Sequence, residues 1–365
     1  MKRRGVLIGG AAILAAGGFG IARSFAGMGS ADDYAKATAA VRAPLRRGDD
    51  VREMVRYATL AANGHNTQPW RFHAAAQSLR IAPDFARRTP IVDPDDHHVF
   101  VSLGCAAENM AQAGAALGKP GVVRFDPAGD GALVYDFTAG APEPSELCDA
   151  VGKRQSAREP YDGRTASAGD LIMLRAAARQ AGVNTTLITE RSTINKVRDL
   201  VIAGNSAQMA DAKFVTELKQ WMRFNPRAAL AHGDGLYAAS SGNPTLPDFM
   251  GAPMFDLAFK PEAENEKYEV QLNTSAGVAV FVGDKADPDH WTRVGQACQR
   301  FALQATALGM KLSFINQPVE APAFREDLAS LVGAKGMRPD ILMRFGYGED
   351  LPFSPRRPIA AVFSA

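Results

Sequence analysis

Strand patterns and helix patterns follow one another irregularly along this chain, and that order constrains its fold more than any single motif. A continuous apolar run at 278–283 (VAVFVG) indicates a buried strand, while apolar residues with helical spacing at about 99–117 and 288–309 indicate long helices. The patterns do not repeat as regular strand–helix–strand units. The sequence therefore predicts an α+β fold with helices packed on sheets, and not a doubly wound parallel sheet.

A proline-rich break, GAPEP, divides the chain into two units. We expect a first lobe at 27–144, with a helix from Asp50, where Asp50 and Glu53 have the spacing of a capping box. Its expected strands are WRFHAA, SLRIAP, VVRF and ALVYDFTA. The second lobe, 145–365, contains further helices and strands and ends in a tail that its prolines keep extended.

The second lobe is interrupted at about 225–266, where helical periodicity is lost. This stretch is rich in Gly, Pro and Ser but also contains Phe, Tyr, Met and Leu. A flexible linker would lack such apolar residues. We therefore expect a lid-like excursion that packs against the rest of the protein.

Composition excludes several classes of protein. With 46% hydrophobic and 22% charged residues, the chain is neither disordered nor a polytopic membrane protein. The net charge of +2 comes from 41 basic and 39 acidic residues, but 1–26 hold four of the basic ones and no acid, which leaves −2 for the remainder. That balance gives no electrostatic case for nucleic acid. The cysteines lack zinc or dithiol spacing, and we expect Cys105 and Cys298 to be buried apolar residues.

Residues 1–26 have the pattern of an export signal. Basic residues at 2–4 precede an apolar stretch at 5–22, and Ser24 and Ala26 are small residues suited to a cleavage site. The arginine pair followed by GVL resembles a twin-arginine signal, whose machinery exports folded proteins. We expect a periplasmic protein; the alternative is an uncleaved N-terminus that anchors it to the inner membrane.

Nucleotide-binding, hydrolase and zinc-protease motifs are absent from the sequence. Asp95, Asp96, His97 and His98 are adjacent, but neighbouring loop residues rarely point at one ion. We interpret them as a solvated helix cap and predict no metal site. The lone cysteines and the histidines lack a partner that would make a nucleophile.

Two segments carry chemistry that suits a mononucleotide. In NGHNTQPW, the amides of Asn66 and Gln68 can read the edge of a planar heterocycle. The alternative is an Asx-rich turn above a buried Trp70. Arg154, Ser156 and Arg158, together with Arg356 and Arg357 in the tail, form a plausible phosphate clamp. Taken singly, each arginine set could equally be an exposed charge pair.

These segments resemble motifs of the nitroreductase superfamily. NGHNTQPWRF is similar to its flavin-contacting turn, KRQSAREPY to its Arg-x-Ser-x-Arg motif, and GYGEDLPFSPRRPIAAVF to its basic tail. The order and spacing, with GQACQRFALQATALGMKLSFINQPVE, resemble the longer Acg-like branch. Ordinary members are homodimers that build each FMN site from both subunits. Because each motif occurs once here, the resemblance implies an internal pseudo-dimer, monomeric, with one FMN site between its lobes.

The resemblance assigns the FMN-binding roles residue by residue. The first lobe would supply the ring and ribityl contacts, and the second lobe the phosphate grip, the edge of the ring and the backbone near N5. Two departures are the Asn-Gln pair where the family has Glu-Gly, and an Asn where it more usually has Ser. The residues concerned are Asn63, Gly64, Asn66, Gln68, Arg154, Ser156, Arg158, Asn316, Gln317, Arg356 and Arg357.

Two functions compete at this stage. The first is an FMN-dependent oxidoreductase that transfers hydride from NAD(P)H or another donor to nitroaromatic or quinone-like acceptors. Because the flavin carries the chemistry, no catalytic side chain is named. The second is an FMN-sequestering protein whose excursion at 225–266 covers the flavin and suppresses turnover. A flavin-free structural relic is a third alternative.

Overall fold

The computed structural model describes residues 24–48 and 50–364 and confirms the α+β class. The predicted leader, residues 1–26, lies almost entirely outside the described residues. The N-terminal part of the described chain contains three α-helices and four strands: α2 (Ala31–Val41), α3 (Asp50–Thr59), α4 (His97–Ala116), β1 (Trp70–Ala75), β2 (Ser78–Pro83), β3 (Gly121–Asp126) and β4 (Ala132–Phe137).

The rest of the described chain is richer in helix. Its α-helices are α5 (Glu146–Val151), α6 (Ala168–Ala177), α7 (Arg191–Ala210), α8 (Ala212–Gln220), α9 (Pro226–His232), α10 (Asp248–Ala258), α11 (Pro261–Asn273), α12 (Pro288–Ala307), α13 (Gln317–Glu320) and α14 (Arg325–Leu331). Its strands are β5 (Val183–Ile188), β6 (Met222–Arg223), β7 (Leu236–Tyr237), β8 (Gly277–Gly283), β9 (Lys311–Phe314), β10 (Ile341–Gly346) and β11 (Phe363–Ser364).

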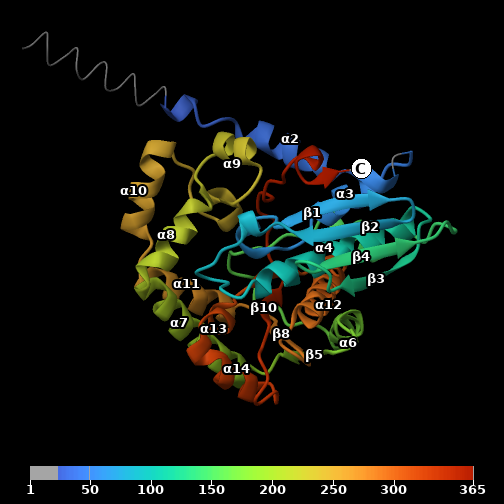
Figure 1. Cartoon of the computed structure of the whole chain (residues 1–365). Helices are drawn as coiled ribbons and strands as arrows, with labels where there is room; N and C mark the ends of the chain where they lie inside the picture. Colours follow the sequence, from blue (N-terminus) through green and yellow to red (C-terminus); the bar gives the residue numbers. More distant parts are fainter. Residues whose placement is uncertain (1–23, 49, 365) are drawn as a thin grey trace, which may run out of the picture.

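Two larger sheets lie on either side of a central pair of helices, as the two-lobed prediction requires (Figure 1). The first sheet has the strand order β11-β1-β2-β4-β3, and the second has the order β5-β8-β10-β9. Strand β11 comes from the end of the chain and pairs in parallel with β1, with Phe363 opposite Phe72. The last residues therefore complete the sheet that the first strand begins.

The continuous apolar character of β8 follows from its position, because both of its faces are covered. Ala279 and Phe281 face the core shared with α4 and α12, while Val278 and Val280 belong to a second core that includes residues of α7. All seven residues of β8 are buried. This is why the strand lacks the polar alternation of a half-exposed strand.

Helices α4 and α12 cross so closely that only glycine fits at the contact. A Cβ on Gly104 would lie 2.0 Å from the carbonyl oxygen of Thr292, and one on Gly295 would lie 2.1 Å from that of Val101. Nearby, Cys105 and Cys298 are buried, as predicted. The small residues of both helices let their backbones approach and bring the two sheets together.

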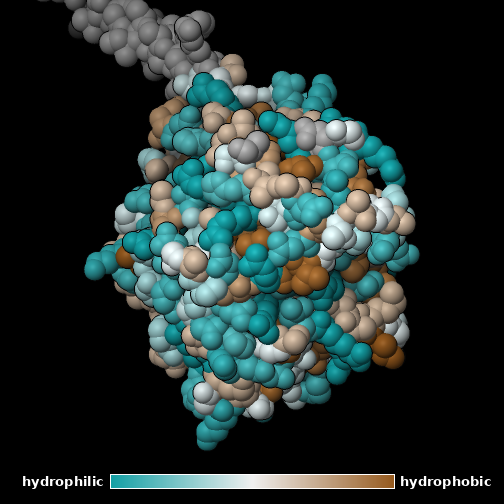
Figure 2. Space-filling view, turned by 45° about the vertical axis from the view of Figure 1, so that its right-hand side comes forward, coloured by the Kyte–Doolittle hydropathy of each residue, from teal (hydrophilic) through white to brown (hydrophobic). Residues whose placement is uncertain are grey.

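The expectation of an irregular stretch at 225–266 is wrong in part. The segment contains α9, β7 and α10 and runs into α11. Helix α10 was missed because Gly251 and Pro253 interrupt its helical pattern, and Phe249 and Leu257 are exposed on it. On the face shown in Figure 2, apolar residues form only small, separated groups among hydrophilic ones.

Two local expectations need correction. Glu53 does not complete a capping box; its carboxylate pairs with Arg56 inside α3, where both side chains are buried. His97 is not part of a solvated cap either, because it is fully buried and bonded to Asp340 at 2.9 Å. The carboxylate of Asp93 accepts from the first amides of α4 instead. Among residues 24–48 and 50–364, no helix combines the length and apolarity needed to span a membrane.

Candidate cofactor site

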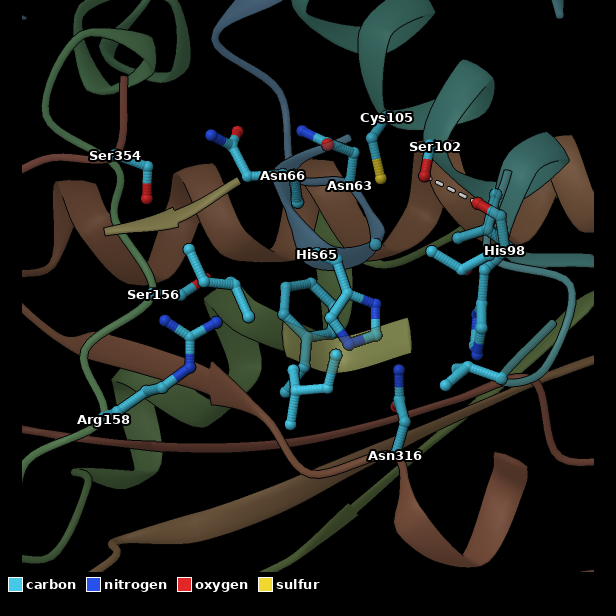
Figure 3. Close-up of a pocket in the computed structure, with 18 of the residues that line it drawn as sticks. Asn63, His65, Asn66, His98, Ser102, Cys105, Ser156, Arg158, Asn316 and Ser354 are labelled. Carbon is cyan, nitrogen blue, oxygen red and sulfur yellow. Dashed lines mark hydrogen bonds between the residues drawn. The ribbon is translucent and has the colours of Figure 1, made fainter. Parts of the chain in front are cut away.

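A cavity of about 260 Å³ lies where elements from both halves of the chain meet. Its lining comes from the turn after α3, the start of α4, the segment after α5, the end of β9 and the C-terminal tail. Figure 3 shows Ser156, Arg158 and Asn316 around His65, with Asn63 and Asn66 on the turn above them. Nine of the predicted residues line it: Asn63, Gly64, Asn66, Arg154, Ser156, Arg158, Asn316, Gln317 and Arg356.

The turn that follows α3 is strained. His65, Asn66 and Gln68 have φ values of 48°, 54° and 54°, and within the described part of the chain Asp96 is the one other non-glycine residue with positive φ. Such left-handed conformations cost free energy and persist where surrounding contacts enforce them. Here the side-chain oxygen of Asn63 accepts a hydrogen bond from the backbone N–H of Gln68 at 2.8 Å. Trp70 is fully buried below the turn, as predicted.

The side-chain amides of Asn66 and Gln68 bond to other segments of the protein, whereas the sequence predicted that they would contact a ligand. The Asn66 amide nitrogen donates to the carbonyls of Gly235 and Pro355, and its oxygen accepts from Arg356. Gln68 is fully buried, does not line the cavity, and donates to Gly233. These amides therefore join the turn to the 225–266 stretch and to the tail.

Arginine side chains gather at one end of the cavity. Arg154 is 4% exposed and donates one bond, to the carbonyl of Leu60, so its Nε and Nη1 are buried without a partner among the described residues. Arg356 donates to several carbonyls around the end of α3, including those of Thr59 and Leu60. Burial, followed by the charges of Arg42 and Arg154, lowers the pKa of Arg356 well below its usual range.

This cluster has no carboxylate beside it. Of the described residues that line the cavity, Glu320 is the one acid, and it pairs with His98 and not with an arginine. Buried, mutually repelling guanidiniums with free N–H groups are suited to a phosphate or another compact dianion. Arg357 does not contribute, because it lies outside the cavity and bonds to the carbonyls of Gln68 and Ala361.

The segment that carries Ser156 and Arg158 runs beside β9, tied to it by a 2.8 Å bond from the Ala157 amide to the Leu312 carbonyl. That bond brings Ser156 and Arg158 to the same cavity as Asn316 and Gln317, which follow β9. Arg158, His65 and Asn316 converge on one space (Figure 3). Burial lowers the pKa of Arg158.

Several cavity residues were not predicted from the sequence, notably Arg42, His65, His98, Glu320 and Tyr268. His98 lies 3.4 Å from Glu320, whose other oxygen accepts from Gln208 at 2.7 Å. Burial alone would lower the pKa of His98, but Glu320 raises it. For His98 the sequence offers one signal of a role in the cavity, because the two adjacent histidines directly precede the apolar run of α4.

Comparison with known proteins gives relatives that match nearly the whole chain. No protein-family model matches it. Two Mycobacterium tuberculosis proteins bear the name "Putative NAD(P)H nitroreductase", designated Rv3131 and acg. The first is 26% identical over 343 residues, covering 90% of this chain and 94% of that protein. The second is 24% identical over 335 residues, covering 86% and 95%. These matches support a relationship between this chain and the nitroreductase superfamily.

Solved structures with weaker likeness include NfnB, an FMN-dependent nitroreductase from Mycobacterium smegmatis in complex with NADPH. It is 10% identical, with a TM-score of 0.41, and covers 59% of this chain and 96% of its own. A nitroreductase with bound FMN from Desulfitobacterium hafniense is 14% identical, with a TM-score of 0.38, and covers 61% and 99%.

Proposed function

We propose that this chain is an FMN-dependent oxidoreductase of the nitroreductase type. It would transfer hydride from NAD(P)H or another donor to electron-poor acceptors such as nitroaromatics or quinones. The observation that carries the proposal is the cavity between the two halves, which has buried arginines with free N–H groups at one end. Relatives named as NAD(P)H nitroreductases support it over nearly the whole chain.

The residues present fit FMN. The unpartnered Nε and Nη1 of Arg154, with Arg356 and the Ser156 hydroxyl, would hold the phosphate. Arg158 and Asn316, with the backbone that enters α13, would border the ring. FMN supplies the hydride chemistry when bound, so the protein's part is to position it and set its potential. A cation at the Arg158 position would favour the anionic reduced ring.

An absorption spectrum of the purified protein tests the proposal. We expect a bound flavin spectrum that bleaches on anaerobic addition of NADPH and returns on addition of a quinone. Arg154→Gln should lower FMN affinity roughly ten- to a hundredfold, because a charge-assisted contact contributes about 1.5–3 kcal/mol. The exposed Arg124→Gln is the matched control. A wild-type protein that binds no flavin would refute the proposal.

A second candidate function, sequestration of FMN, is favoured by the contacts of the 225–266 stretch. Leu236 and Phe259 from this stretch line the cavity. The backbone of Gly235 both donates to and accepts from Asn66, and Asp234 pairs with Arg87 and Arg223. A stretch held in this way would cover a bound flavin and limit access by donors and acceptors.

We also propose export to the periplasm by the twin-arginine route, and the division into lobes 27–144 and 145–365 around one site. Export rests on the pattern of residues 1–26 alone. The lobe division is supported by the break before α5 and by the sheets, because, apart from β11, the strands of the first sheet come from 27–144 and those of the second from 145–365. A protein exported by this route would carry its FMN from the cytoplasm, and anchoring through an uncleaved N-terminus remains the alternative.

A further inference from the structure

Arg42 reaches the arginine end of the cavity from outside every motif that the sequence singled out. It follows α2, and its Nη2 donates to the carbonyl of Ser354 at 3.3 Å. Its guanidinium carbon lies 4.2 Å from the centre of the Phe353 ring. Its Nε and Nη1 are buried and have no hydrogen-bond partner among the described residues. The side chain therefore brings free donors to a site already rich in positive charge.

The backbone around Arg42 is fixed by a separate set of bonds. Arg56 donates to the carbonyls of Val41 and Ala43 at 2.8 Å each and to that of Pro44 at 3.1 Å. Arg56 is itself held by the buried carboxylate of Glu53. Because both flanks of Arg42 are anchored, its entry into the cavity is a defined feature of the fold.

Helix α2 has few other attachments. Of its residues, Tyr34 and Thr38 are buried. Tyr34 packs on Tyr237 with ring centres 4.4 Å apart, and its hydroxyl donates to the carbonyl of Phe353 at 2.6 Å. A helix with so little buried surface is expected to open readily. Any ligand held by Arg42 would add substantially to its attachment.

We propose that Arg42 is a further ligand of the phosphate monoester in this site, and that phosphate binding fastens α2 to the rest of the protein. The proposal rests on the proposed function for the identity of the ligand, FMN. A phosphate monoester carries a charge of about −1.5 to −2 and can accept from several guanidiniums at once. It would offset the repulsion among Arg42, Arg154 and Arg356 and accept hydrogen bonds from their unpartnered N–H groups.

The experiment compares FMN, riboflavin and inorganic phosphate by calorimetry on the wild-type protein and on Arg42→Gln. Riboflavin has the same ring system but no phosphate. We expect Arg42→Gln to weaken FMN binding roughly ten- to a hundredfold and to leave riboflavin binding unchanged. Arg47→Gln removes a charge from an exposed position of the same segment and should change neither FMN binding nor riboflavin binding. Arg42→Lys, which keeps the charge, provides a second variant should the glutamine variant not fold, with an intermediate loss expected.

Hydrogen exchange of α2 amides tests the attachment. We expect FMN and inorganic phosphate, but not riboflavin, to slow exchange across Ala31–Val41 in the wild type and not in Arg42→Gln. Equal loss of FMN and riboflavin affinity would overturn the role of Arg42, and so would unchanged FMN affinity. Unchanged α2 exchange would overturn the attachment. Protection by inorganic phosphate in a protein that binds no flavin would uphold the Arg42 site while refuting the proposed function.

Discussion

At the residue scale, His97 and His98 are neighbours in opposite environments. His97 is fully buried, and burial lowers its pKa well below the usual value, while burial raises the pKa of its partner Asp340 to about 7. His98 lines the cavity, where Glu320 and Asp93 raise its pKa against the effect of burial. Burial therefore dominates at His97, whereas the neighbouring carboxylates outweigh it at His98.

The His98–Glu320 pair predicts a pH dependence of stability. A folded pKa of His98 above its unfolded value of about 6.5 gives stabilisation that is complete below that pH and lost as pH rises through the folded pKa. The pKa of Glu320 is lowered, so it stays charged over this window. We expect Glu320→Gln to cost about 1.5–3 kcal/mol near pH 6 and much less near pH 9.

Urea unfolding at the two pH values measures this difference. His232→Gln, which changes an exposed histidine on α9, should leave stability nearly constant at both. If Glu320→Gln lowered the free energy of unfolding equally at pH 6 and pH 9, the stabilisation by this pair would not depend on the protonation of His98.

Sequence patterns predicted nine of the residues that line the cavity but not the others. The turn and the Arg-x-Ser-x-Arg segment carry recognisable motifs, and Asn66 and Ser156 do line one cavity. Arg42 carries no such signal, because a lone arginine in a weakly patterned segment looks like any solvated charge. Gln68 and Arg357 were predicted to line the site but lie outside the cavity. A motif identifies residues that a site requires, but it does not show whether they contact the ligand or support the residues that do.

At the scale of elements, α4 and α12 cross with their backbones in close contact. The backbone oxygens opposite Gly104 and Gly295 leave no space for a side chain. Strands β1 and β2 have the bounds predicted from their sequences, since turn residues enclose them. Helices α10 and α11 were not predicted, because their apolar residues lack the helical period that a one-sided core contact would impose.

Gly104→Ala is expected to destabilise the protein by about 1–3 kcal/mol, since the added methyl group must push the two helices apart. Thermal unfolding measures the change. Gly169→Ala in α6 is the matched control, because the nearest atom to its Cβ would be 3.7 Å away, and it should be neutral or slightly stabilising. Equal melting temperatures for the two variants would show that the helix crossing adapts freely.

Asp234→Asn is expected to loosen the 225–266 stretch, because it removes the charge partner of Arg87 and Arg223. If this stretch limits access to a bound flavin, anaerobic reduction by NADPH in a stopped-flow instrument should become several-fold faster. Asp256→Asn, which removes an exposed pair with Lys219 on the outer surface, is the control. Unchanged reduction by NADPH in the Asp234 variant would count against the covered-flavin candidate.

At the scale of the whole molecule, the cavity depends on segments from both halves of the chain. The prediction of two units followed from the proline-rich break, and that of one site between them from motifs that each occur once. The pairing of β11 with β1 was not predictable, since two short strands almost 300 residues apart leave no local trace of their partnership. The same holds for the bonds that join Asn66 to Gly235 and Pro355.

If the proposed twin-arginine export is correct, replacing Arg3 and Arg4 by lysines will retain the protein in the cytoplasm, because that machinery selects the arginine pair. Cell fractionation and immunoblotting measure the distribution. Replacing Lys2 by arginine keeps the basic charge and the pair, and should not alter export. Secretion of the double-lysine protein at the normal rate would refute this route.

The C-terminal tail has a consequence for how the protein is made. Arg356 closes one end of the cavity, and Val362 accepts the backbone bond from Phe72 that begins the β11 pairing. These residues follow β1 by almost 300 positions, so the nascent polypeptide can form much of its core before they emerge. The ligand pocket is complete only once the tail has docked beside the turn that follows α3.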